Sequence, residues 1–289
     1  MGRWYTFTMS APASSSHASL IALLAAEVSA LAGFSQKAGA AWVTITGSGG
    51  KTSLMEKLAC HLARQLDRRV IISTTTRLAS PADHSYLCDH MVLDGDLSGL
   101  YSHPLAGEVV LFGMMESGKI ASPGVEKLDA LASRCDVLLL EGDGARHRPL
   151  KIHAERDPII PAKTQLVIAL MGLSAYGKPL DEDSCYLPDR YRELTGDRLH
   201  TIGAEMYRRL LDHPQGVFKG VAGQRVVLVL NQSDRLDAAE IVGLGKRMIA
   251  DWTGIQFLFV AGSVKEDIVI HHEEVMGSNP VKGAACAHF

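Results

Sequence analysis

Short, continuous runs of apolar residues recur along the chain from residue 41 onward. They do not alternate with polar residues, which is typical of strands covered on both faces of a sheet. We expect strands over residues 41–46, 69–73, 108–112, 136–140, 165–170, 225–230 and 256–260. Apolar residues at helical spacing predict helices over residues 51–66, 123–134, 203–212 and 237–251. This alternation predicts an α/β fold, a three-layer sandwich around a mainly parallel sheet.

The same pattern predicts one main domain with short additions. The domain is expected to span residues 37–270, with a helical insertion at about 172–224, where a long polar stretch separates two core strands. Residues 1–36 would form an N-terminal segment and a helix, and residues 271–289 a C-terminal tail. The tail begins with His271-His-Glu-Glu274, which we interpret as solvated rather than metal-binding, because adjacent histidines point to different sides.

The longest apolar stretch, Leu20 to Leu31, raises the question of a membrane span or a signal peptide. It is shorter than the ~20 residues that cross a bilayer, and Glu27 interrupts it. Its apolar positions also fit an amphipathic helix of a soluble protein. We therefore expect a soluble helix here and a cytoplasmic protein.

Composition narrows the classes of function. Of the 289 residues, 47% are hydrophobic and 21% are charged, as in ordinary globular proteins. The 29 basic and 32 acidic residues give a formal net charge of −3, so no global basic field attracts nucleic acid or an anionic membrane. The five cysteines include no C-x-x-C pair, which favours free thiols in a reducing compartment over a disulfide framework. We expect neither a nucleic-acid nor a membrane partner.

A glycine-rich loop between the first strand and the first long helix carries the strongest chemical signal. Glycines let backbone N–H groups converge on phosphate oxygens, and the start of a helix adds its dipole. Lys51 would reach the β- and γ-phosphates of a nucleotide, and Thr52 would ligate Mg²⁺. Nucleotide contacts are expected from Gly47, Ser48, Gly49, Gly50, Lys51, Thr52 and Ser53. The fold is therefore expected to be P-loop NTPase-like, with a short G-x-x-G-K-T loop that is similar to Mur-ligase-type ATP domains.

Hydroxyl groups and a cation follow the second predicted strand directly, in Ser73-Thr-Thr-Thr-Arg77. Consecutive parallel strands end at the same edge of a sheet, where ligands collect. Thr75, Thr76 and Arg77 are therefore candidate contacts to phosphate or to Mg²⁺, and Arg77 could form a charge-assisted clamp. The alternative is a strand end capped by threonine.

Two carboxylates follow the strand at 136–140. Glu141 comes directly after apolar residues and is the better candidate to hold Mg²⁺ together with Thr52, whereas Asp143 lies between glycines and could be a turn residue. A basic loop comes next, with Arg146, Arg148, Lys151 and His153. Such a loop could bind an anionic substrate or a transferring phosphoryl group, and its alternative is a solvated basic surface.

The strand at 225–230 runs into Asn231-Gln-Ser-Asp234, an N-x-x-D arrangement. An amide and a carboxylate placed in this way can read a nucleobase edge, with Asp234 accepting hydrogen bonds from guanine. Gln232 stands where the GTPase form N-K-x-D has lysine, which weakens the case for guanine. Asn231 and Asp234 could equally be the start of a helix with its N-cap.

Five blocks of the sequence, taken together, resemble the YqeC family. They are Gly47–Leu54, Ser73–Arg77, Glu141–Lys151, Asp157–Pro161 and Asn231–Asp234. The resemblance runs from about residue 30 to residue 262, and departs from the family's E-A-D-G-A motif at Gly142. It implies a bacterial cytoplasmic P-loop protein that serves as an accessory factor in the maturation of a selenium-dependent molybdenum hydroxylase.

The leading hypothesis is a Mg²⁺-dependent NTPase, or a nucleotide-driven transferase, that uses ATP or GTP in selenium or molybdenum cofactor maturation. Lys51 would neutralise phosphate charge, Thr52 and Glu141 would hold Mg²⁺, Asp143 would belong to the same catalytic group, and Arg146 or Arg148 would stabilise the transition state. One alternative is a Mur-ligase-like ATP-dependent ligase. Another is a nucleotide-gated chaperone or scaffold that docks on the hydroxylase or its other maturation factors.

Overall fold

The apolar runs form the centre of a large sheet. The structure is a computed structural model that describes residues 18–31, 39–100, 102–196 and 200–277. Its main strands are β1 (Ala41–Gly47), β2 (Val70–Thr74), β4 (His90–Val92), β5 (Val109–Phe112), β8 (Val137–Glu141), β10 (Leu166–Gly172), β12 (Arg225–Asn231), β13 (Phe257–Ser263) and β14 (Ile268–Val275). Within the described residues they form a nine-stranded sheet in the order β14-β13-β12-β10-β1-β8-β2-β5-β4. All neighbours in it are parallel except β13 and β14.

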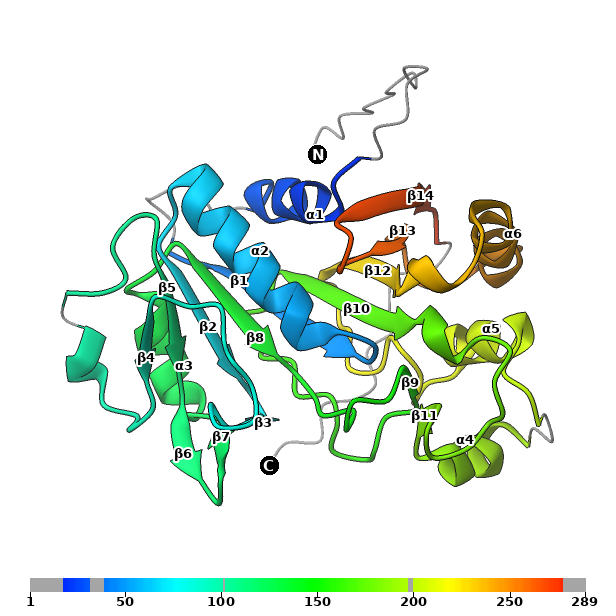
Figure 1. The fold of residues 1–289 in the computed structure, drawn as a ribbon, viewed down its shortest axis with the longest axis horizontal. Coiled ribbons are helices and arrows are strands. Elements are labelled where there is room, and N and C mark those ends of the chain that lie inside the picture. The colour runs from blue at the N-terminus through cyan, green and yellow to red at the C-terminus, as the bar shows by residue number, and fades with distance from the viewer. Residues whose placement is uncertain (1–17, 32–38, 101, 197–199, 278–289) are drawn as a thin grey trace.

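Helices cover both faces of this sheet (Figure 1). On one face, α1 (Leu20–Ser29) and α2 (Lys51–Leu66) share a buried core with β1, β2 and β10. On the other face, α3 (Val125–Ala132) packs on β1, β5 and β8, whereas α5 (Ala204–Asp212) and α6 (Ala238–Ile249) pack on β10, β12 and β13. The predicted α/β three-layer sandwich with a mainly parallel sheet is confirmed.

The N-terminal helix is part of the main core. Leu20, Leu24 and Val28 of α1 are fully buried against α2 and the sheet. The start of α1 is held by the turn after β13, because Asp267 accepts hydrogen bonds from Ser19 Oγ and the Ile21 N–H, each at 2.8 Å. None of the described helices is long and apolar enough to cross a membrane. The remainder of the segment predicted for residues 1–36 lies largely outside the described residues.

The predicted start of a C-terminal tail at residue 271 lies inside β14. This strand pairs antiparallel with β13, with His271 opposite Ala261 and His272 opposite Val260. Its residues alternate between more and less buried positions, as expected for a strand at the edge of a sheet. His271 and His272 therefore point to opposite faces, in agreement with the interpretation that they hold no metal together.

The segment from residue 172 to 224 contributes helices that pack on the main core. It contains β11 (Cys185–Tyr186), α4 (Pro188–Thr195) and α5, and β11 pairs with β9 (Leu150–Lys151). Tyr207 of α5 is fully buried, and its hydroxyl donates a hydrogen bond to the Gly172 carbonyl at 2.8 Å. A third sheet begins shortly after the end of β2. It consists of β3 (Arg77–Leu78), β7 (Lys119–Ala121) and β6 (Met114–Glu116).

Candidate functional site

A cleft opens at the carboxyl ends of the parallel strands β1, β2 and β8. Its volume is about 690 Å³. The glycine-rich loop and the start of α2 form one wall, residues 76–79 form a second, and residues 144–148 a third. Glu141 lies at its base, nine-tenths buried or more. This is the edge where ligands bind in open α/β sheets.

The glycine-rich loop adopts a conformation that requires glycine. Gly47, Gly49 and Gly50 have φ angles of 89°, 85° and 114°, which side-chain-bearing residues rarely adopt. A Cβ atom at Gly49 would lie 2.6 Å from Gly172 Cα, so the loop also packs directly on the end of β10. Ser48 Oγ donates a hydrogen bond to the Pro149 carbonyl at 2.9 Å, which ties the loop to the basic loop opposite.

Lys51, Thr52 and the two predicted carboxylates lie together under this loop. Lys51 Nζ is 3.3 Å from Asp143 Oδ1 and 3.7 Å from Glu141 Oε1, and it donates a hydrogen bond to the Gly47 carbonyl at 2.9 Å. Thr52 Oγ1 donates to Glu141 Oε2 at 2.8 Å. The glycine-rich loop and the end of β8 thus bring one ammonium, one hydroxyl and one carboxylate together in the cleft.

Burial and charge act in opposite directions on these groups. Burial lowers the pKa of Lys51, but the carboxylates of Asp143 and Glu141 more than reverse this, so its pKa lies above its usual value. Burial raises the pKa of Glu141, and Lys51 and the Thr52 hydroxyl only partly offset that increase. The carboxyl group of Glu141 is therefore more easily protonated than that of Asp143.

Asp143 is the centre of a fully buried charge cluster. It accepts hydrogen bonds from the Gly47 N–H at 3.0 Å and from Lys151 Nζ at 2.8 Å, and His153 Nδ1 lies 3.2 Å from its Oδ2. Burial raises the pKa of Asp143, but Lys51, His153 and Lys151 together hold it well below the usual range. Asp143 thus braces the loop from beneath, and it does not line the cleft.

The basic loop divides into two parts that the sequence does not distinguish. Lys151 and His153 are buried against Asp143, so they lie away from the cleft. Arg146 and Arg148 line the cleft. The Arg146 guanidinium lies 5.5 Å from the centre of the Tyr186 ring, and Arg148 Nη2 is 3.4 Å from Asp183 Oδ1 in an exposed pair. The loop therefore offers two arginines to a ligand.

The neighbouring strand β1 leaves no room for a side chain at position 142, which is glycine. A Cβ atom there would lie 2.8 Å from Thr44 Cγ2 and 3.1 Å from Thr46 Cγ2. The two threonines of β1 occupy the space that the alanine of the E-A-D-G-A motif would need. The departure from that motif thus leaves Glu141 and Asp143 in place.

The threonines after β2 differ in their surroundings. Thr75 is buried, and its hydroxyl donates a hydrogen bond to the Ile159 carbonyl at 2.8 Å. Thr76 and Arg77 line the cleft, and Arg77 Nη2 is 2.9 Å from Glu116 Oε2 in an exposed ion pair. Thr75 thus supports the strand end, and its two neighbours line the cleft.

Asn231 and Asp234 also have different surroundings. Asn231 is 4% exposed, donates to the Gly49 carbonyl at 2.7 Å and accepts from the Val264 N–H at 2.8 Å. It therefore connects the glycine-rich loop to the turn after β13. Asp234 is exposed and does not line the cleft, with Ser263 Oγ 3.5 Å from its Oδ1.

Replacing Asn231 by alanine should lower the free energy of unfolding by about 1–3 kcal/mol, because the buried Gly49 carbonyl and Val264 N–H lose their partner. Urea denaturation of the two proteins measures this difference. Asp234→Ala is the matched control, and its change should stay within about 0.5 kcal/mol because the side chain is exposed. Equal losses for both variants would contradict the bracing role of Asn231.

The structure brings most of the predicted nucleotide contacts to the cleft, namely Gly49, Gly50, Lys51, Thr52, Ser53, Thr76, Arg77, Glu141, Arg146 and Arg148. The other predicted residues, Gly47, Ser48, Thr75, Asp143, Asn231 and Asp234, do not line it. Sequence reasoning missed several lining residues, among them the polar residues His84, Lys119 and Gln232. His84 and Lys119 come from irregular segments or short strands without a motif. Gln232 lies within the N-x-x-D arrangement, and it accepts a hydrogen bond from Ser174 Oγ at 2.7 Å.

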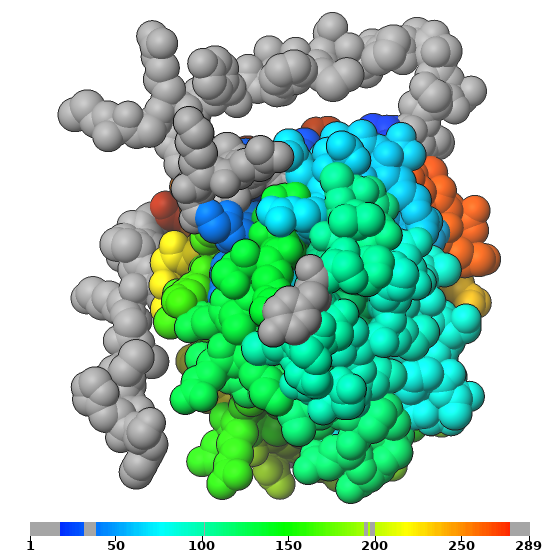
Figure 2. Space-filling view, turned by 90° about the vertical axis from the view of Figure 1, so that its left-hand side faces the viewer, coloured from blue at the N-terminus to red at the C-terminus, as the bar shows by residue number. Residues whose placement is uncertain are grey.

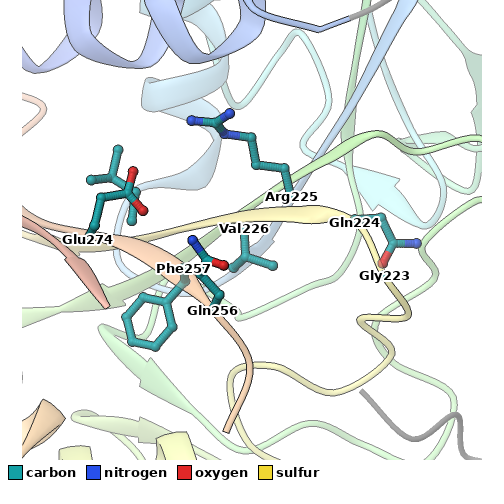
Figure 3. A pocket seen from close by; sticks show the side chains of 8 residues that line it. Gly223, Gln224, Arg225, Val226, Gln256, Phe257 and Glu274 are labelled. Carbon is teal, nitrogen blue, oxygen red and sulfur yellow. The ribbon is translucent and has the colours of Figure 1, made fainter. Parts of the chain in front are cut away.

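A smaller pocket of about 260 Å³ lies at the opposite ends of the strands, near the start of β12 and β13 (Figure 3). Arg225 and Phe257 line it and belong to opposite faces of the sheet. Arg225 forms an ion pair with Glu27 of α1, whereas Phe257 is buried in the core beneath α5 and α6. Arg225 is thus already paired with Glu27, and we assign no ligand to this pocket.

Comparison with known proteins identifies relatives of this chain. A family model described as YqeC protein matches residues 43–189, which include the glycine-rich loop, Glu141, Asp143 and the basic loop. The chain is 32% identical over 209 residues to a protein of Escherichia coli (strain K12) described as uncharacterized protein YqeC, covering 68% of this chain and 78% of that protein. No solved structure matches. On the family model and on this relative, the chain belongs to the YqeC family.

Proposed function

We propose that this protein binds a Mg²⁺–nucleoside triphosphate in the cleft and hydrolyses it or transfers its terminal phosphoryl group. The observation that carries the proposal is the group formed by Lys51, Thr52 and Glu141 beneath a loop of three glycines with positive φ. Backbone N–H groups at such a loop and the start of α2 attract phosphate. Lys51, held charged by its carboxylate partners, is placed to meet the β- and γ-phosphates.

The oxygens of Thr52 and Glu141 fit the dimensions of a magnesium site. Mg²⁺ takes oxygen ligands at 2.0–2.1 Å in octahedral geometry, so two adjacent ligands are about 2.9 Å apart. Thr52 Oγ1 and Glu141 Oε2 are 2.8 Å apart. Bound Mg²⁺ would neutralise charge that develops on the phosphate oxygens. The Thr52 hydroxyl would then turn from donating to Glu141 to presenting a lone pair to the metal.

The cations that line the cleft besides Lys51 favour an anionic second substrate. They include Arg146, Arg148 and Lys119. Cations aimed at developing or transferring negative charge are typical of sites of phosphoryl transfer. We therefore favour a nucleotide-driven transferase over simple hydrolysis.

The cellular role follows from the family resemblance, not from the geometry of the site. We propose that the protein acts in the cytoplasm as an accessory factor in the maturation of a selenium-dependent molybdenum hydroxylase. The anionic second substrate would then belong to selenium or molybdenum cofactor chemistry.

The deciding experiment measures Mg²⁺-dependent binding of ATP and GTP, side by side, to the wild type and to Lys51→Ala. Loss of a charged hydrogen-bond donor costs about 1.5–3 kcal/mol, so the affinity should fall by roughly ten- to a hundredfold. Lys246→Ala is the matched control, since Lys246 is exposed on α6 on the other face of the sheet. The proposal would be refuted if the folded wild type bound neither nucleotide, or if Lys51→Ala bound them as tightly as the wild type.

A further inference from the structure

Two histidines and a glutamate converge at the other end of the sheet. His90 begins β4, His103 lies in the loop before β5, and Glu108 immediately precedes β5. His103 Nδ1 is 2.9 Å from Glu108 Oε2, and His90 Nε2 is 3.5 Å from Glu108 Oε1. One potential ligand atom of each residue lies within 4.8 Å of those of the other two. Within the described residues, no other group of three histidine, cysteine or acidic side chains meets this criterion.

The backbone around the cluster holds these side chains in place. Parallel pairing puts His90 opposite Val110, next to the start of β5. The Val109 N–H donates to Asp89 Oδ2 at 2.8 Å, and the Asp89 N–H donates to the Val109 carbonyl at 2.8 Å. The Leu105 N–H donates to Glu108 Oε2 at 2.8 Å, which orients the carboxylate. Such outer contacts are typical of ligands held for a metal.

The donor set and its spacing suit one kind of ion. Two imidazole nitrogens and a carboxylate oxygen are ligands of Zn²⁺ and related divalent transition metals. At bond lengths of about 2.0–2.1 Å, tetrahedral ligand atoms are about 3.3 Å apart. The separations of His103 and His90 from Glu108, 2.9 and 3.5 Å, lie on either side of that value. The imidazole rings are 3.9 Å apart between centroids, and each has a nitrogen within 3.5 Å of a Glu108 oxygen.

We propose that His90, His103 and Glu108 form a binding site for a divalent transition metal of the Zn²⁺ class, with a fourth coordination position open to solvent. The side chains are 40%, 30% and 24% exposed, so an ion and an external ligand can reach them.

This site is separate from the nucleotide cleft. His90 and Glu108 lie at the amino ends of β4 and β5, whereas the cleft lies at the carboxyl ends of the central strands. Figure 2 faces the side of the molecule on which β4 and β5 lie. A metal here would cross-link the edge strand β4 to the segment that enters β5. Metal binding at this site can therefore be tested independently of nucleotide binding.

The test is a titration of the purified full-length protein with Zn²⁺ in competition with a chromophoric chelator at neutral pH. The wild type should bind a single equivalent at this site. His90→Ala and Glu108→Gln should each weaken binding at least tenfold, because loss of even an outer-shell partner has an effect of about that size. His271→Ala/His272→Ala is the matched control and should bind as the wild type does.

A second measurement separates loss of a ligand from loss of the fold. Zn²⁺ should raise the melting temperature of the wild type and of the control, but not that of His90→Ala, while the melting temperatures without metal stay close. Co²⁺ should give the visible absorption of a tetrahedral site in the wild type and in the His271/His272 control, but not in His90→Ala or Glu108→Gln. No Zn²⁺ binding by the wild type, unchanged affinity in His90→Ala and Glu108→Gln, or loss of binding only in the control would each overturn the proposal.

Discussion

Replacing Glu141 by glutamine should slow Mg²⁺-dependent nucleotide turnover by about a hundred- to a thousandfold, the usual loss when one preorganised electrostatic group is removed from a site. Glu141 Oε2 lies 2.8 Å from Thr52 Oγ1, and the carboxylate supplies the negative charge of the proposed Mg²⁺ site. Glutamine keeps the shape of the side chain and removes that charge. The Mg²⁺ concentration that gives half-maximal turnover should therefore rise. Steady-state turnover across a Mg²⁺ titration measures both effects.

The fold should survive this substitution. Burial disfavours the charged form of Glu141 and raises its pKa, so a neutral amide does not add a desolvation cost at this position. Glu116→Gln is the control, because Glu116 is exposed. Among the predicted site residues it contacts Arg77, in an exposed ion pair. Equal turnover and an equal Mg²⁺ requirement in Glu141→Gln would remove Glu141 from the metal site.

The central sheet could be predicted because burial on both faces leaves a clear mark in the sequence. Each of the seven expected strands begins within one residue of an observed one, and the helix expected over 51–66 is α2. The strands that the pattern missed are short or lie at edges. β4 has three residues and begins with His90, and β14, at the edge of the sheet, contains four consecutive polar residues, His271 to Glu274. Neither produces a continuous apolar run.

The candidate site was predicted where local sequence determines geometry. The glycine-rich loop places Lys51 and Thr52 through its own spacing, and Glu141 ends β8, which lies beside β1. What failed was the assignment of roles within a loop. Lys151 and His153 look like surface cations in the sequence, but the return of the chain through β9 buries them against Asp143. Asn231 looks like a base-reading residue, yet its amide contacts the backbone of two loops distant in sequence.

Asp143→Asn should lower the free energy of unfolding by about 3–5 kcal/mol, the usual cost of removing one partner from a buried ion pair. Asparagine keeps an acceptor for the Gly47 N–H but leaves Lys51 and Lys151 buried without their shared carboxylate. Urea denaturation measures the loss. The exposed pair of Asp129 and Lys163, 2.7 Å apart, supplies the control, and Asp129→Asn should cost less than about 1 kcal/mol.

The double variant Asp143→Asn/Lys151→Met separates lost charge pairing from lost packing. Methionine keeps most of the apolar stem of Lys151, which is 2% exposed, and removes its ammonium group. With both partners neutral, no uncompensated charge is left between them, so the two single losses should not add. The double variant should be more stable than their sum predicts by about 1–3 kcal/mol, the coupling expected of residues in direct contact. Additive losses would mean that the ion pair between Asp143 and Lys151 does not stabilise the fold. The glycine-rich loop would then be braced by the other contacts of Asp143, with Gly47, Lys51 and His153.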